Sequence, residues 1–355
     1  MEKYYNDAII GNKEMIASFT KKGELIRLFY PNTDYRQFID FFNVGLKIND
    51  SSNIYLHSDV NNTYNQYYTE DTNILNTEIF NTYFKARILQ TDFICDSKNV
   101  LVKKYKVKNE NNIDLETSFI VHSSLLTDDN NQVSGYYKND SLIQYMHDYS
   151  FLICSNKKVK TSQINNNIET IESGVVWDKD YIGMSSDSSI SFDLGVLKPK
   201  QETEFCIFIT LHKGSEIKGI DSKIEELKKI DYKKELEKTK KYWEKYVKEH
   251  DKVKFSHSNT EFMKKVDKIY KRTILLYPLL TNSKTGGISA AVEIDENRTK
   301  CGRYSYCWPR DGIFITNALD LLGMEKKLKN SIKHFVKWHK VNLVCGSKDS
   351  IQMEV

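Results

Sequence analysis

Paired cysteines and long apolar runs are largely missing from this chain, and proline is scarce, with 4 in 355 residues. The 6 cysteines lie far apart and include no C-x-x-C spacing. This argues against a disulfide framework and favours buried free thiols in a reducing compartment. No apolar run approaches the roughly 20 residues that a membrane span needs. The N-terminus also lacks the apolar core of a signal peptide. We therefore expect a cytoplasmic protein with no membrane partner.

A basic block is also absent. The net charge of +4 is spread along the chain, and its lysine-rich stretches carry interleaved glutamates. This pattern argues against a nucleic-acid partner. No group of residues has metal-ligand spacing, so we expect neither a metal nor a cofactor. With 40% hydrophobic and 28% charged residues, the chain has the composition of a globular protein that is long enough for two or three domains.

The first 213 residues have the pattern of an antiparallel β-sandwich. Short apolar or alternating runs recur between clusters of Asn, Asp, Ser and Gly, with no helical pattern between them. Because the runs are many, the sandwich should be large. The clearest candidate strands are residues 24–30, 86–94, 100–107, 115–121, 190–194 and 205–211.

The pattern becomes helical after residue 213. Residues 214–258 are rich in Lys and Glu and predict a linker helix, with a possible break near Ile230-Asp231. Trp243 and Val247 should share its apolar face with Leu236. Residues 259–355 form the third predicted unit. In its first helix the apolar spacing is 3–4 residues and Pro278 ends the segment; the residues at that spacing are Phe262, Val266, Ile269, Tyr270, Thr273 and Tyr277.

Two further helices are predicted in this third unit. One covers about 312–322, with Gly323 in the C′ position, and the other covers about 325–339. Helices with a single apolar face cannot close a core by themselves.

Residues 303–312 contain the side chains that are best suited to binding a ligand. Their sequence RYSYCWPRDG places three aromatic residues beside an Arg-Asp pair. The Trp308 indole can cover the apolar face of a sugar ring. Arg310 donates in a fixed fork and Asp311 accepts, so together they can hold two adjacent hydroxyl groups. A purely structural interpretation is also open: Asp311 as the N-cap of a helix that starts at Gly312, Arg310 paired with a nearby carboxylate, and Trp308 in the core.

The segment 304–311, with the lead-in 281–296 (TNSKTGGISAAVEIDE), resembles the signature loop of glycoside hydrolase family 15, the glucoamylase and glucodextranase family. The resemblance implies a β-super-sandwich, a helical linker and the first helices of an (α/α)6 barrel. It also implies that Trp308, Arg310 and Asp311 grip the non-reducing terminal glucose in the −1 subsite. Tyr304 and Tyr306 match the motif as further substrate-binding residues, with a less defined role.

The same resemblance implies an inverting hydrolysis of α-glucans. In that mechanism a carboxylic acid and a carboxylate lie about 6.5–9.5 Å apart on opposite faces of the sugar. In the family both glutamates come from later barrel helices, beyond residue 355, so no catalytic residue is named in this chain. Glu293, Asp295 and Glu296 are expected to be solvated or structural. We expect little or no activity from the 355 residues alone.

Residues 344–355 do not resemble the family. In a shifted reading frame, permitted codons of this tail include a Trp-x-Gln-Arg segment like that of bacterial members. We therefore hypothesise a frameshift between about Val341 and Cys345 and a non-native tail, the alternative being a natural C-terminus. Two functional alternatives also stay open: a disaccharide phosphorylase of similar architecture, and a non-enzymatic carbohydrate-binding protein.

Overall fold

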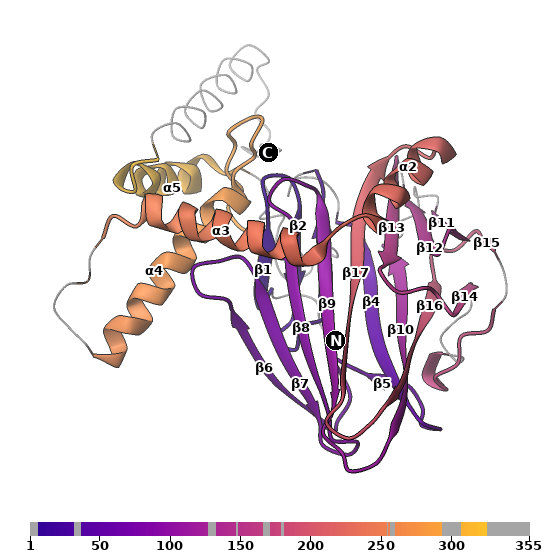
Figure 1. The fold of residues 1–355 in the computed structure, drawn as a ribbon. Helices are drawn as coiled ribbons and strands as arrows, with labels where there is room; N and C mark the ends of the chain where they lie inside the picture. Colours follow the sequence, from indigo (N-terminus) through magenta and orange to yellow (C-terminus); the bar gives the residue numbers. More distant parts are fainter. Residues whose placement is uncertain are drawn as a thin grey trace.

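The computed structural model describes residues 6–31, 37–126, 133–146, 148–165, 171–178, 181–253, 255, 260–292 and 307–324. Antiparallel strands make up the first part of the chain and helices follow, with the helices α3, α4 and α5 gathered on one side of the strands (Figure 1). The sequence-predicted segments 293–306 and 325–355 lie outside the described residues. They contain Tyr304, Tyr306, the three acidic residues of the lead-in, the helix predicted at about 325–339 and the tail for which a frameshift is hypothesised.

The larger layer of the sandwich is a nine-stranded antiparallel sheet. Its order is β15 (Ile182–Gly183), β11 (Val133–Lys138), β12 (Ser141–Met146), β13 (Tyr149–Ser155), β17 (Glu202–Lys213), β9 (Val100–Asn109), β8 (Ala86–Ile94), β7 (Leu75–Asn81) and β6 (Asn62–Tyr68). Five strands form the facing layer, in the order β14 (Thr161–Ile164), β16 (Ser188–Leu197), β10 (Leu115–Leu125), β4 (Ile39–Ile48) and β5 (Ile54–Tyr55). The six strands predicted most clearly from apolar or alternating runs are all present, with residues 24–30 in a third sheet and the other five in these two layers. Continuous apolar runs identify strands that are buried on both faces, such as residues 205–211 of β17.

A third sheet holds the first strands of the chain, β1 (Ala8–Gly11), β2 (Ile16–Phe19) and β3 (Leu25–Phe29). It contributes to both main cores. Phe19 and Leu25 pack into the sandwich interior, whereas Ile16 and Phe29 pack against the helices. The sheet therefore ties the sandwich to the helical part.

The sandwich interior is apolar with one buried polar network. Phe119 of β10 packs against Phe205 of β17 with ring centroids 4.9 Å apart, which joins the two layers. Within this core, Lys103 Nζ lies 2.7 Å from Asp92 Oδ1, and both side chains are fully buried. Gln90 continues the network, since it donates to Asp92 Oδ2 at 2.6 Å. Burial raises the pKa of Asp92 and lowers that of Lys103, and the charge of each partner opposes the shift.

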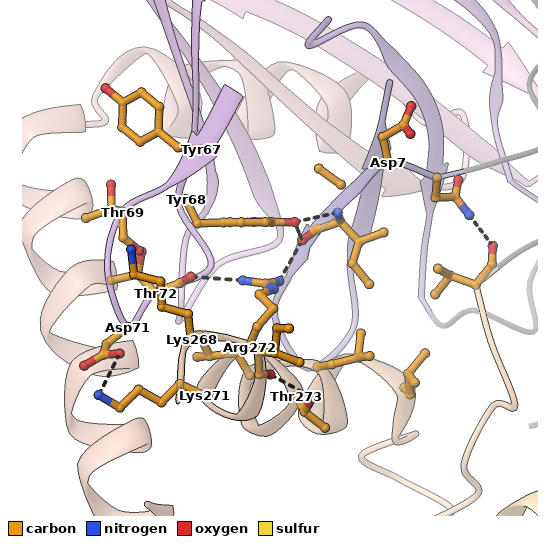
Figure 2. A pocket seen from close by; sticks show the side chains of 18 of the residues that line it. Asp7, Tyr67, Tyr68, Thr69, Asp71, Thr72, Lys268, Lys271, Arg272 and Thr273 are labelled. Carbon is orange, nitrogen blue, oxygen red and sulfur yellow. Dashed lines mark hydrogen bonds and ion pairs between the residues drawn. The ribbon is translucent and has the colours of Figure 1, made fainter. Parts of the chain in front are cut away.

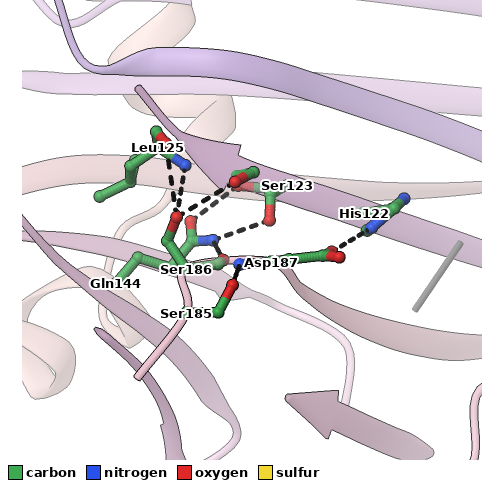
Figure 3. Close-up of polar contacts among 8 residues, drawn as sticks. His122, Ser123, Leu125, Gln144, Ser185, Ser186 and Asp187 are labelled. Atoms are coloured by element: carbon green, nitrogen blue, oxygen red, sulfur yellow. Dashed lines mark hydrogen bonds and ion pairs between the residues drawn. The ribbon is translucent and has the colours of Figure 1, made fainter. Parts of the chain in front are cut away.

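A second polar cluster lies where the two layers meet (Figure 3). Ser123 Oγ of β10 donates to Gln144 Oε1 of β12 at 2.7 Å, and Gln144 Nε2 donates to the carbonyls of Ser123 and Ser186. On the other face of β10, His122 Nε2 lies 2.5 Å from Asp187 Oδ1. Because Ser123 and Gln144 bond to one another across the layers, they satisfy buried polar atoms that would otherwise be costly to bury.

Among the described residues, four helices follow the last strand: α2 (Ile217–Lys228), α3 (Tyr232–His250), α4 (Glu261–Leu280) and α5 (Pro309–Leu321). The predicted break between the first two is confirmed, and Asp231 caps α3 by accepting from Lys234 N at 3.2 Å. Trp243 and Val247 are buried as predicted. Within the described ranges, no helix is both long enough and apolar enough to cross a membrane.

Helix α4 departs from the sequence prediction in two ways. It continues through Pro278 and ends at Leu280, so the expected stop at proline was wrong. The predicted apolar stripe is also not the buried one, because Phe262 and Ile269 are 71% and 67% exposed. The buried residues are instead at the C-terminal end of α4: Ile274, Leu275, Pro278, Leu279 and Leu280. There the helix packs on Trp243, Ile16 and Phe29, which explains why packing outweighs the cost of an internal proline.

Candidate functional site

The candidate sugar-binding residues lie at the start of α5. Trp308 is the N-cap residue, Pro309 is the first helical residue and Asp311 is in the first turn. The alternative in which Asp311 caps a helix that starts at Gly312 is therefore wrong by three residues. The helix starts earlier because the fixed φ of proline suits the first helical position, where its missing N–H costs nothing. The predicted C-terminus is confirmed, with Gly323 at a φ of 69° closing the helix.

Trp308, Arg310 and Asp311 come together at this helix start. Arg310 Nη2 lies 3.5 Å from Asp311 Oδ2, and the Arg310 side chain is 82% exposed. The Trp308 side chain is partly buried, and its Nε1 is buried without a hydrogen-bond partner among the described residues. A fork of donors, an acceptor and an aromatic surface thus occupy four consecutive positions. The carboxylate of Asp311 is also favoured by the positive end of the helix.

A short turn after α4 holds this loop in place. Thr281 and Ile288 form an isolated antiparallel bridge. Asn282 Oδ1 accepts from Lys284 N at 2.9 Å and from Thr285 N at 3.0 Å. Ile288 N then donates to the Sγ of buried Cys307 at 3.4 Å. Since Cys307 immediately precedes Trp308, the turn fixes the start of the segment that carries the candidate residues. Burial raises the pKa of Cys307, which keeps the thiol protonated.

Arg272 of α4 anchors the helix to the sandwich (Figure 2). Its guanidinium donates to the carbonyls of Thr72 at 3.1 Å and Ile9 at 3.0 Å. It also lies over the Tyr68 ring, 3.7 Å from the centroid. The Tyr68 hydroxyl bonds the backbone of Ile9, accepting from N and donating to O, both at 2.9 Å. A continuous chain of contacts therefore runs from β1 and β6 through α4 and the turn to Trp308.

Arg272 and its partners were not identified from the sequence. The partners lie 200 and 263 residues away along the chain, and a single Arg within a lysine-rich helix gives no local signal. Where the structure is described, no group of three or more His, Cys, Asp or Glu side chains is placed to hold a metal ion.

Comparisons with known proteins give two kinds of likeness. In sequence, the chain is 29% identical over 337 residues to an uncharacterized glycosyl hydrolase of Methanocaldococcus jannaschii, covering 90% of this chain and 51% of that protein. In structure, it matches a bacterial glucoamylase solved in complex with acarbose, with a TM-score of 0.74 and 14% identity. That match covers 96% of this chain and 51% of the glucoamylase. No family model matches the sequence.

A weaker structural match is to a kojibiose-phosphorylase-like protein from the human microbiome. Its TM-score is 0.51 at 13% identity, over 69% of this chain and 36% of that one. The chain thus has a glucoamylase-like fold and resembles a glycosyl hydrolase in sequence. It spans about half the length of the relatives that it matches.

Proposed function

We propose that this chain is the substrate-gripping half of a glucoamylase-like glycoside hydrolase of family 15 type. A complete enzyme would release glucose from the non-reducing ends of α-glucans by inversion. The chain would supply the sandwich (residues 1–213), the linker (214–258) and the first barrel helices (from 259). The general acid and base would come from the part of the fold that lies beyond it.

The observation that carries this proposal is the arrangement at the start of α5. The Arg310 fork lies beside the Asp311 carboxylate and follows directly on Trp308. A terminal glucose offers an apolar face and neighbouring hydroxyl groups, which these three groups match in kind. Charge-assisted bonds of this type are exacting about geometry, so they select the orientation of the sugar. Similarity to a glycosyl hydrolase and to the glucoamylase fold supports the same conclusion.

Acarbose binding tests this proposal. Titration calorimetry of the 355-residue chain should show Trp308→Ala and Arg310→Ala each weakening acarbose binding about tenfold or more, a loss of roughly 1.4 kcal/mol. Trp177→Ala is the matched control, because Trp177 is a 57% exposed tryptophan of the first 213 residues. If Trp308→Ala binds acarbose as the unchanged chain does, the loop is not the site. A carbohydrate-binding role elsewhere would then be the better account.

A disaccharide phosphorylase is the second candidate, favoured by the structural match to a kojibiose-phosphorylase-like protein. The two activities differ in the attacking group, which is water in a hydrolase and phosphate in a phosphorylase. A protein that carries this sequence with a complete barrel should release glucose from maltotriose at a rate independent of phosphate. Formation of glucose 1-phosphate that requires phosphate would favour the second candidate.

A further inference from the structure

A pocket of about 730 Å³ lies between the sandwich and α4, apart from the start of α5. We call it the junction pocket. Its walls are the residues 6–9 that lead into and begin β1, the end of β6 with the following turn (67–72), one face of α4, and residues 290–292 (Figure 2). None of residues 307–311 lines it. A volume of this size is in the range of pockets that take small ligands.

The rigid part of the wall is the Arg272–Tyr68 pair. Arg272 uses its guanidinium for two backbone carbonyls and the face of the Tyr68 ring. A guanidinium has five N–H donors, and in the described part of the chain no carboxylate forms an ion pair with Arg272. The guanidinium is therefore held in place at the wall before a ligand arrives, which lowers the entropic cost of binding.

The remaining charged groups of the wall nearly balance. Lys271 Nζ lies 3.0 Å from Asp267 Oδ2 and 3.9 Å from Asp71 Oδ1. Lys268 and Glu70 also line the pocket, are exposed, and make no hydrogen bond or ion pair among the described residues. Asp7 adds a fourth carboxylate to set against three cations. A wall of mixed sign with apolar and aromatic surface suits a neutral ligand with many hydroxyl groups better than an anion or a cation.

A purely structural role explains the Arg272 clamp but not the open space beside it. Tight packing is the rule where two elements only need to be joined, and the helix end at Ile274 to Leu280 shows such packing against Trp243. The pocket lies along the same helix and shares Leu275 and Leu280 with that packed end, yet a volume of about 730 Å³ remains beside them. The exposed Lys268 and Glu70 that line it make no hydrogen bond or ion pair among the described residues. This contrast favours a binding site over a packing defect.

We propose that the junction pocket is a second carbohydrate-binding site that takes a short neutral α-glucan oligosaccharide. The choice of α-glucan rests on the proposed function, whereas the site itself rests on the pocket alone. A ligand there would contact the sandwich and α4 at once. It would therefore stabilise the junction that positions the Trp308 loop.

Equilibrium dialysis with radiolabelled maltotriose tests the proposal on the 355-residue chain. The unchanged chain should bind two equivalents. Ala291→Trp, which places an indole at the pocket wall, should bind one. Trp308→Ala should also bind one, and the double variant none. Thermal unfolding of each variant checks that its fold is kept.

Lys268→Ala covers the case in which Ala291→Trp does not fold, because an exposed lysine on α4 is removed without touching the core. It should weaken the junction-site affinity about fivefold or more, as expected for loss of a hydrogen bond from a charged donor. Lys264→Ala is its matched control, an exposed lysine one turn earlier that does not line the pocket.

The outcomes separate this proposal from the proposed function. If only Trp308→Ala removes a site, the junction site is overturned and the proposed function stands. If only Ala291→Trp removes one, the junction site stands and the assignment of the Trp308 loop fails. Two equivalents bound by both variants, or none bound by the unchanged chain, would overturn both.

Discussion

Large side chains are buried in the sandwich interior, whereas several on the helices α4 and α5 are exposed. Between the sheets, Phe119 and Phe192 are fully buried, and even the charged Lys103 is enclosed with a partner. On the helices, Phe262 and Phe314 are each 71% exposed and Leu321 is 82% exposed. The sandwich is therefore stabilised by its own core, whereas the candidate sugar-binding residues lie on a helix with few buried side chains around it. Substitutions should separate the two regions: large effects on folding in the first, small ones in the second.

The largest effect is expected at the buried ion pair. Lys103→Met removes the cation and leaves the Asp92 carboxylate buried without its charge partner. The free energy of unfolding should fall by about 3–5 kcal/mol, measured by urea denaturation. The double variant Lys103→Met with Asp92→Leu should recover most of the loss, since apolar replacement of a whole pair is often neutral. A loss below about 1 kcal/mol in the single variant would show that the pair does not support the sandwich.

Acid should weaken the sandwich through His57. Its ring is buried, with Nε2 2.8 Å from Gln90 Oε1. Burial, helped by the Lys103 charge, lowers the pKa of His57 from 6.5 to about 3. Between these two values the unfolded chain binds one more proton than the folded one, so stability falls as the pH falls below 6.5.

The cost follows from this difference. Between pH 6.5 and 5 the free energy of unfolding should fall by about 2 kcal/mol because of His57, at roughly 1.4 kcal/mol per pH unit. His57→Gln removes the titrating group while keeping a polar side chain near Gln90, and its unfolding free energy should lose that much less over the same interval. Parallel pH profiles for the two proteins would contradict the assignment.

The smallest effect is expected on the exposed helices. Phe314→Ala should change the unfolding free energy by no more than about 0.5 kcal/mol, because the ring is mostly in contact with water. Phe119→Ala, the matched change in the sandwich, should cost about 3–5 kcal/mol. Equal costs at the two positions would remove the distinction between the regions.

The strands of the sandwich were predicted from the sequence more accurately than the buried face of α4, for a physical reason. A strand is marked by a local run of apolar or alternating residues whatever its partner is, and β8 at Ala86–Ile94 matched its predicted bounds. The buried face of α4 depends instead on which neighbours pack there, and the 3–4 spacing selected Phe262 and Ile269, which are exposed. At α5 a helix was predicted from the sequence, but its start was placed too late because Pro309 was not counted as a first helical residue. The junction pocket depends on contacts more than 190 residues apart in sequence, such as Arg272 with Thr72, and no local pattern reports those.

The most direct test of the central claim is to observe the indole N–H of Trp308 while acarbose is added. The chain has 4 tryptophans, so protein labelled with nitrogen-15 at Trp gives a spectrum of four side-chain signals, assigned by single Trp→Phe variants. The account predicts that the Trp308 signal moves in a saturable manner while those of Trp243 and Trp177 stay in place. A Trp308 signal that stays fixed at acarbose concentrations that shift another tryptophan would contradict it.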